Sequence, residues 1–272
     1  MNRFVQLSRP VVVIMGVLFL FAAALIAAGD GISDHLRGLL IAVPAVIAFV
    51  IGGNSINDYS DRETDRISHP NRPIPSGRIE PQTALRIGIV SLTVSAVFSF
   101  MLPNLTATCI VLAACAFIVI YELYLKKIGF LGNITIGVLT GMVLLLGGAV
   151  VYDVQKCYVV AVMIFLISMG KEIASDIEDM TGDVDRNTLP RRLGVQNARY
   201  VATAFLITAV LLSVFPILSG SVDTMYVSMI IADILISAAI YSMYVRPDNF
   251  QRLIVPAMFM TVLSFLLGSV TV

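Results

Sequence analysis

The feature that most constrains this chain is a series of nine apolar runs, each about 20 residues long. An α-helix needs a run of that length to cross a bilayer, and it satisfies its own backbone hydrogen bonds there. The chain is 58% hydrophobic and 13% charged, against roughly 45–50% and about 25% in soluble domains. We therefore expect an all-α membrane protein with nine transmembrane helices, forming one domain over residues 1–272. The runs lie at approximately 11–28, 38–57, 84–102, 105–123, 131–151, 157–175, 198–219, 223–244 and 252–271.

Basic residues predict the orientation, because cytoplasmic loops are enriched in Lys and Arg. If all nine runs span the bilayer, 16 of the 18 basic residues lie on one side, and only Arg37 and Lys156 lie on the other. We therefore expect a multi-pass protein of the cell membrane with its N-terminus in the cytoplasm. A signal peptide is the alternative for the first run, but the charge pattern favours a first transmembrane helix.

Two acidic clusters end the second and sixth runs. Each has polar side chains spaced four, three and four apart, which on a helix places them on one face. Both clusters fall on the cytoplasmic side, so the repeat is parallel, and we expect a duplicated four-helix unit, about 1–125 and 126–245, plus one helix. The loops that follow are long and rich in charge, and we expect them to form a cytoplasmic cap. The clusters are Asn54, Asp58, Asp61, Asp65 and Glu172, Asp176, Asp179, Asp183.

Carboxylates at this spacing repel one another, so a cation is expected between the clusters. Oxygen ligands on two helix ends suit Mg²⁺, which usually completes its shell with water and substrate phosphate. Nearby basic residues then indicate a diphosphate, although for any one of them except Lys126 we favour a role in topology or headgroup binding. These candidates are Arg72, Lys126, Lys127, Lys171, Arg191 and Arg192. Zero net charge argues against a nucleic-acid partner, and no protein partner is implied.

A diphosphate at the membrane face leaves the rest of its ligand among apolar helices, and an isoprenyl diphosphate has that shape. Five glycines in the fifth run provide a small-residue surface, which either a lipid channel or close helix packing explains; they are Gly132, Gly137, Gly141, Gly147 and Gly148. A transporter is the alternative from another class, because many spans and an internal repeat are also its signature. Transporters, however, usually place ionisable sites near the midplane. Asp233 is the one acidic residue deep within an apolar run, and we favour a structural role for it.

The paired motifs Asn57-Asp58-x-x-Asp61-x-x-x-Asp65 and Asp176-x-x-Asp179-x-x-x-Asp183, with Tyr121-x-x-x-x-Lys126 between them, resemble the UbiA superfamily of intramembrane prenyltransferases. The resemblance covers nearly the whole chain. The segments 66–78 and 171–183 look like its archaeal branch, which attaches a second geranylgeranyl ether to a glycerol phosphate lipid precursor. One departure is that Val11 and Val12 follow Arg9-Pro10, where the family commonly carries Asn.

The resemblance implies Mg²⁺ bound to the donor's diphosphate, with Lys126 stabilising the departing pyrophosphate. It implies that Tyr121 and Tyr124 neighbour the allylic carbocation, and that Arg72, Lys171 and Arg9 contact the acceptor's phosphate. Transfer to an aromatic quinone precursor is the alternative within the enzyme class. The implied metal ligands are Asn54, Asp58, Asp61, Asp65, Asp176, Asp179 and Asp183; Asp58, Asp61, Asp176, Asp179, Lys126 and Tyr121 are the implied catalytic residues.

Overall fold

The computed structural model describes residues 3–181 and 187–269, and within these ranges it consists of helices and loops without strands. The described residues form nine helices of at least 17 residues: α2 (Pro10–Ala28), α3 (Leu36–Ser60), α5 (Pro81–Ser99), α6 (Leu105–Leu123), α7 (Phe130–Val150), α8 (Tyr158–Glu178), α10 (Val195–Leu212), α12 (Met229–Val245) and α13 (Phe250–Ser269). Four short α-helices accompany them: α1 (Arg3–Ser8), α4 (Arg62–Ser68), α9 (Leu189–Leu193) and α11 (Phe215–Leu218). The 3₁₀ turns are η1 (Gly29–His35), η2 (Leu125–Lys127), η3 (Gln155–Cys157), η4 (Asp179–Thr181), η5 (Thr224–Ser228) and η6 (Pro247–Asn249).

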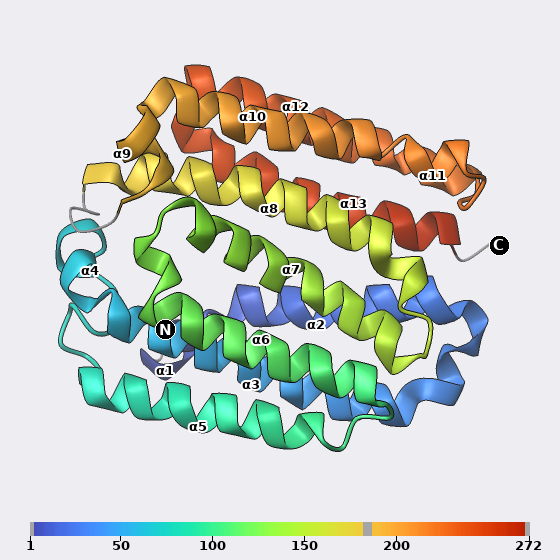
Figure 1. Cartoon of the computed structure of the whole chain (residues 1–272), viewed down its shortest axis with the longest axis horizontal. Coiled ribbons are helices and arrows are strands. Elements are labelled where there is room, and N and C mark those ends of the chain that lie inside the picture. Colours follow the sequence, from blue (N-terminus) through green and yellow to red (C-terminus); the bar gives the residue numbers. More distant parts are fainter. Residues whose placement is uncertain (1–2, 182–186, 270–272) are drawn as a thin grey trace.

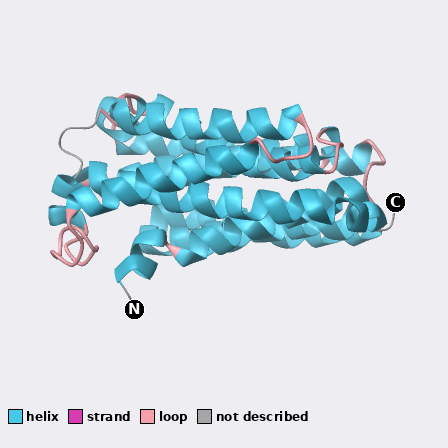
Figure 2. Ribbon diagram, turned by 90° about the horizontal axis from the view of Figure 1, so that it is seen from below, coloured by secondary structure: helices cyan, strands magenta, loops and turns pink. Residues whose placement is uncertain are grey.

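The long helices run side by side with their connections at the two ends of the bundle (Figures 1 and 2). Helix α7 packs against α2, α6 and α8, while α3 packs against α5, α8 against α10, and α12 against α13. The all-α fold expected from the apolar runs is confirmed. The predicted duplication of a four-helix unit stays a prediction.

Eight segments of the described chain are long and apolar enough to span a membrane. The first, Pro10–Ser60, has 51 residues and as one straight helix would measure roughly 75 Å, more than twice the hydrocarbon thickness. It instead contains both α2 and α3, joined by η1, and α2 folds back along α3 so that Gly16 faces Val46 and Val50. The multi-pass architecture is confirmed, whereas nine crossings stay a prediction.

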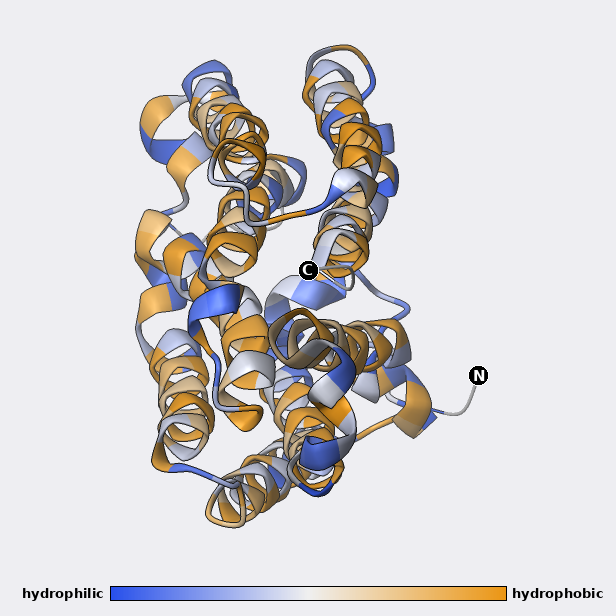
Figure 3. Ribbon diagram, turned by 90° about the vertical axis from the view of Figure 1, so that its right-hand side faces the viewer, coloured by the Kyte–Doolittle hydropathy of each residue, from blue (hydrophilic) through white to orange (hydrophobic). Residues whose placement is uncertain are grey.

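Hydrophobic residues occur along all the long helices (Figure 3). Large apolar side chains are exposed on the outside of the bundle as well as buried in its interior. Leu40 is 68% exposed, Phe100 72% and Leu218 80%. In water, so much exposed apolar surface would promote association. In a bundle of membrane-spanning helices, these exposed apolar side chains face the hydrocarbon of the lipids.

The glycines of α7 serve mainly close helix packing. A Cβ at Gly147 would lie 2.5 Å from the Leu20 carbonyl oxygen of α2, and one at Gly141 would lie 3.0 Å from the Ala161 carbonyl oxygen of α8. Gly137 meets the Phe165 ring of α8 in the same way. Of the two explanations open from the sequence, packing accounts for these positions, and Gly132 alone of the five lines a cavity.

The expected cap is built of short helices and loops. Helices α4 and α9 lie at the same end of the bundle as the ends of α3 and α8 (Figure 1). The loop after α4 is tied together by the Arg78 guanidinium, which donates to the Asn71 carbonyl and to the Ser76 hydroxyl. The described residues of the two acidic clusters therefore lie at the end of the bundle that carries α4 and α9.

Candidate active site

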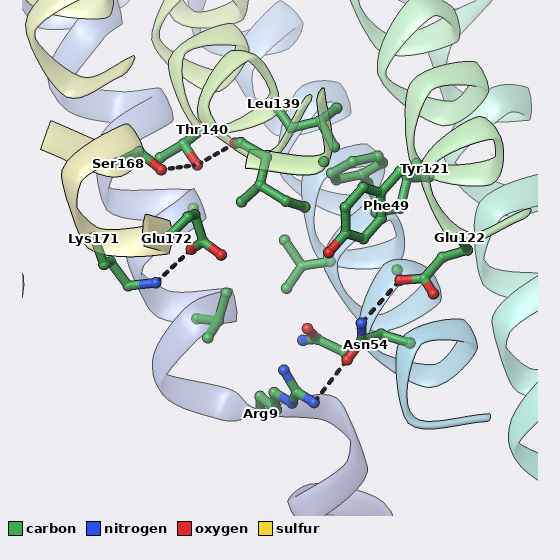
Figure 4. A pocket seen from close by; sticks show the side chains of 18 of the residues that line it. Arg9, Phe49, Asn54, Tyr121, Glu122, Leu139, Thr140, Ser168, Lys171 and Glu172 are labelled. Atoms are coloured by element: carbon green, nitrogen blue, oxygen red, sulfur yellow. Dashed lines mark hydrogen bonds and ion pairs between the residues drawn. The ribbon is translucent and has the colours of Figure 1, made fainter. Parts of the chain in front are cut away.

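A cavity of about 610 Å³ lies between α2, α3, α6, α7, α8 and α13. Charged and amide side chains, among them Arg9, Asn54 and Lys171, line the end nearest the cap (Figure 4). Phe19, Val46, Ile110 and Leu146 line the interior. Along α7 the lining extends from Gly132 to Leu146, a rise of roughly 20 Å. The cavity therefore suits a ligand with a charged head and a long apolar tail.

Three of the four residues of the first acidic cluster line one wall of the cavity. Asn54, Asp61 and Asp65 line the cavity, but Asp58 is 3% exposed and ion-paired with Arg9. Helix α3 ends at Ser60, so Asp61 and Asp65 do not continue its face. The prediction that these residues share one continuous helix is corrected accordingly: the polypeptide bends between α3 and α4.

Lys126 joins this wall to α6. Its Nζ lies 2.7 Å from Asp61 Oδ2 and 2.9 Å from Glu122 Oε2, and the Tyr121 ring centroid is 5.7 Å away. The other Glu122 oxygen accepts a 2.9 Å hydrogen bond from the Asn57 amide, whose carbonyl oxygen in turn accepts one of 3.2 Å from Arg9. These side chains form one connected network, and it fixes the ammonium of Lys126 at the cavity wall.

Asp65 is anchored by the cap. Arg72 Nη1 lies 2.8 Å from each Asp65 oxygen. Burial raises the pKa of the Asp65 carboxyl above its ordinary value, and the Arg72 hydrogen bond opposes this effect without cancelling it. The pair holds the loop after α4 over the cavity.

The second acidic cluster lines the opposite wall, on α8 and η4. Asp176 accepts a 2.9 Å hydrogen bond from the Asn133 amide of α7, and Lys171 donates one of 2.7 Å to Glu172. Asp179 Oδ1 lies 3.9 Å from His69 Nε2, which links this wall to the first cap loop. Asp183 lies outside the described residues. The structure thus brings part of each predicted cluster to one cavity: Asn54, Asp61 and Asp65 of the first, and Glu172, Asp176 and Asp179 of the second.

No three His, Cys, Asp or Glu side chains of residues 3–181 and 187–269 form a ready metal cage. Asn54, Asp61 and Asp65 on one wall and Asp176 and Asp179 on the other supply only oxygen donors. Such a set fits Mg²⁺, which is bound through one or two carboxylates plus substrate phosphates and water rather than by an all-protein site.

Comparison with known proteins identifies the family. Residues 17–263 match the profile of the UbiA prenyltransferase family. The chain belongs to that family. A digeranylgeranylglyceryl phosphate synthase of Methanosphaera stadtmanae is 34% identical over 254 residues, covering 92% of this chain and 89% of the relative.

Solved structures agree with this UbiA assignment. A structure of a digeranylgeranylglyceryl phosphate synthase matches with a TM-score of 0.78 and 28% identity, covering 99% of this chain and 98% of the other. A UbiA homolog from Archaeoglobus fulgidus, bound to GPP and Mg²⁺, matches with a TM-score of 0.67 over the full length of both chains. At 15% identity, this second likeness bears on the fold alone.

The predicted substrate-binding residues of this UbiA chain divide into two groups. Arg9, Arg72, Lys126 and Lys171 line the cavity, as does Tyr121 of the predicted catalytic set. Tyr124 is 65% exposed and lies outside the cavity lining, because α6 ends at Leu123 and the chain turns there. Of the two tyrosines expected near the reacting carbon, the structure brings only Tyr121 to the site.

Sequence reasoning missed two residues of the site, Glu122 and Asn133. Glu122 precedes Lys126 by four positions, the spacing of a stabilising pair on a helix, and it lies at the end of an apolar run, where a buried acid calls for a partner. That signal was available in the sequence. Asn133 offered none, because its partner Asp176 is distant in the chain.

Proposed function

We propose that this chain transfers a geranylgeranyl group from geranylgeranyl diphosphate to geranylgeranylglyceryl phosphate, releasing pyrophosphate, with Mg²⁺ as cofactor. The observation that carries this proposal is one cavity with acidic side chains on two walls at one end and a long apolar interior. The synthase names of the relatives support the choice of donor and acceptor. The oxygen donors on two walls of the cavity support Mg²⁺ as the cofactor, and the A. fulgidus homolog, which shares the fold, is bound to GPP and Mg²⁺.

The charged end of the cavity would hold the diphosphate. Bound Mg²⁺ supplies neutralisation of the developing pyrophosphate charge. Its proposed ligands are Asn54, Asp61, Asp65, Asp176 and Asp179, together with Asp58 and Asp183. Of these, Asp58 would have to release Arg9.

Lys126 would donate to the oxygens of the leaving group, because its ammonium is already held at the wall by Glu122. The apolar interior excludes water, which protects an allylic carbocation from hydrolysis. Tyr121 presents its ring beside Lys126, at the boundary between the charged and apolar parts. A ring at this place stabilises positive charge on the reacting carbon.

The acceptor's phosphate needs a second basic contact. Lys171 lies on the α8 wall and Arg9 lies at the start of α2 (Figure 4), and Arg72 lines the same cavity from the loop after α4. We assign the acceptor phosphate to these three residues. The mouth of the cavity then faces the cytoplasm, in agreement with the basic residues around it.

The test offers purified protein radiolabelled geranylgeranyl diphosphate and Mg²⁺, with geranylgeranylglyceryl phosphate or 4-hydroxybenzoate as acceptor. We expect transfer to the glycerol phosphate, and its loss on adding a chelator. Transfer to the aromatic acceptor alone would retain the family and overturn the substrate assignment. Transfer to neither would overturn the proposal and favour a transport role.

A further inference from the structure

Two carboxylates line the cavity besides the proposed metal ligands: Glu122 on α6 and Glu172 on α8. They lie on opposite walls (Figure 4). The proposed transfer needs a group that accepts the proton of the acceptor hydroxyl as this oxygen bonds to the allylic carbon. These two residues are the natural candidates for that group.

Glu122 is already committed to the protein. Its side chain is 2% exposed, Oε1 accepts from Asn57 and Oε2 lies against Lys126. A proton on either oxygen would disrupt a buried network that is otherwise satisfied. Glu122 therefore positions its neighbours and is a poor proton acceptor.

Glu172 is more accessible. Its side chain is 22% exposed, and the hydrogen bond from Lys171 engages Oε1 at 2.7 Å. The Lys171 ammonium balances the charge of the carboxylate through Oε1. The other oxygen, Oε2, points away from Lys171 (Figure 4). This arrangement is that of a charged carboxylate within reach of a ligand in the cavity.

The depth of Glu172 also fits. It precedes Asp176 by one helical turn, which places it roughly 6 Å further into the bundle than the acidic layer. A diphosphate held at Asp176 and Asp61 would place its C1 carbon just below that layer, where the apolar lining begins. One turn further along the same face, Ser168 lies 3.3 Å from the Thr140 hydroxyl, so polar groups continue down this wall.

We propose that Glu172 is the general base of the reaction. The allylic C1–O bond breaks and pyrophosphate leaves with the electron pair. The acceptor hydroxyl oxygen then forms the new ether bond to C1, and its proton passes to the Glu172 carboxylate. The proposal rests on the proposed function, since it takes its acceptor from there.

The test compares Glu172→Gln with Glu172→Asp in the full-length protein, using the acceptor that the wild type accepts. We expect Glu172→Gln to lower the transfer rate about 10²–10⁴-fold, as for loss of a general base. Glu172→Asp retains a carboxylate and should recover a large part of that loss. Mg²⁺-dependent binding of labelled geranylgeranyl diphosphate should stay close to wild type in both variants, since the diphosphate site is intact.

A matched control is Glu178→Gln, the same substitution on the same helix at an exposed position outside the cavity lining. It should transfer at the wild-type rate. Wild-type transfer by Glu172→Gln would overturn the proposal, as would equal losses in the Gln and Asp variants, or donor binding lost in parallel with transfer. Failure of the proposed function would be seen separately, in the wild type: it would transfer the prenyl group only to the aromatic acceptor or to neither acceptor.

Discussion

Lys126 Nζ lies between two carboxylates, 2.7 Å from Asp61 and 2.9 Å from Glu122. Asp61 belongs to the acidic cluster that we assign to metal and diphosphate, whereas Glu122 belongs to the bundle interior. When Asp61 engages another cation, Glu122 still holds the ammonium in place. The pairing thus gives the leaving group a fixed donor.

The first prediction concerns the chemistry of Lys126. Lys126→Gln should lower the geranylgeranyl transfer rate by about 10²–10³-fold, the usual effect of removing one donor to a developing negative charge. Steady-state kinetics with saturating acceptor measures this. The control is Lys127→Gln, because Lys127 is exposed and, unlike Lys126, does not line the cavity. It should transfer at close to the wild-type rate, whereas a rate near wild type in Lys126→Gln would contradict the role of Lys126.

The second prediction concerns the coupling of Lys126 with Glu122. Each single change to Gln leaves a buried charge with fewer partners, while the double variant removes both charges together. The stability losses should therefore be less than additive, with a coupling of about 0.5–3 kcal/mol. Unfolding of the four proteins in one detergent measures the cycle, and strict additivity would show that the contact contributes nothing.

The third prediction concerns pH and Asp65. Because its pKa is raised above the ordinary 3.8 in the folded protein, the native state takes up a proton more readily than the unfolded chain as the pH falls. The stability of the wild type relative to Asp65→Asn should therefore increase between neutral pH and about pH 4, and level off below. Thermal unfolding of both proteins, without divalent cations, tests this. A difference that shrinks on acidification would have the wrong sign.

The fourth prediction concerns the contact of α7 with α2. Gly147→Ala places a methyl 2.5 Å from the Leu20 carbonyl oxygen and 2.7 Å from the Ala23 methyl, so the helices must separate. We expect a loss of about 1–3 kcal/mol in stability, measured by unfolding in detergent. Gly31→Ala, where a Cβ meets nothing within 4 Å, is the control, and equal effects would contradict the packing argument.

The helices were predictable from the sequence because each apolar run is long and bounded by charge or turn residues. The predicted 105–123 agrees with α6 at both ends, and 11–28 with α2 within one residue. The cap followed from the charged, Pro-rich loops. These features are local, and hydrocarbon leaves a chain few alternatives to helices.

The details of the site were less predictable because they depend on where helices end and what packs beside them. Spacing alone assigned Asp58 to the cavity, yet Arg9, distant in the chain, binds it in the wall. Spacing likewise could not reveal that Tyr124 turns outward after α6. Contacts between side chains of different helices decide which residues reach the cavity, and the periodicity of a single segment does not predict these contacts.

In the proposed function, the two acidic walls of the cavity act together on one diphosphate. The most direct measurement is the rate of Mg²⁺-dependent transfer from geranylgeranyl diphosphate to geranylgeranylglyceryl phosphate by Asp61→Asn and by Asp176→Asn, each compared with wild type. Thermal unfolding confirms that each variant is folded. We predict that either change alone abolishes transfer, because each removes one wall of the site. Near-normal transfer by either folded variant would contradict the account.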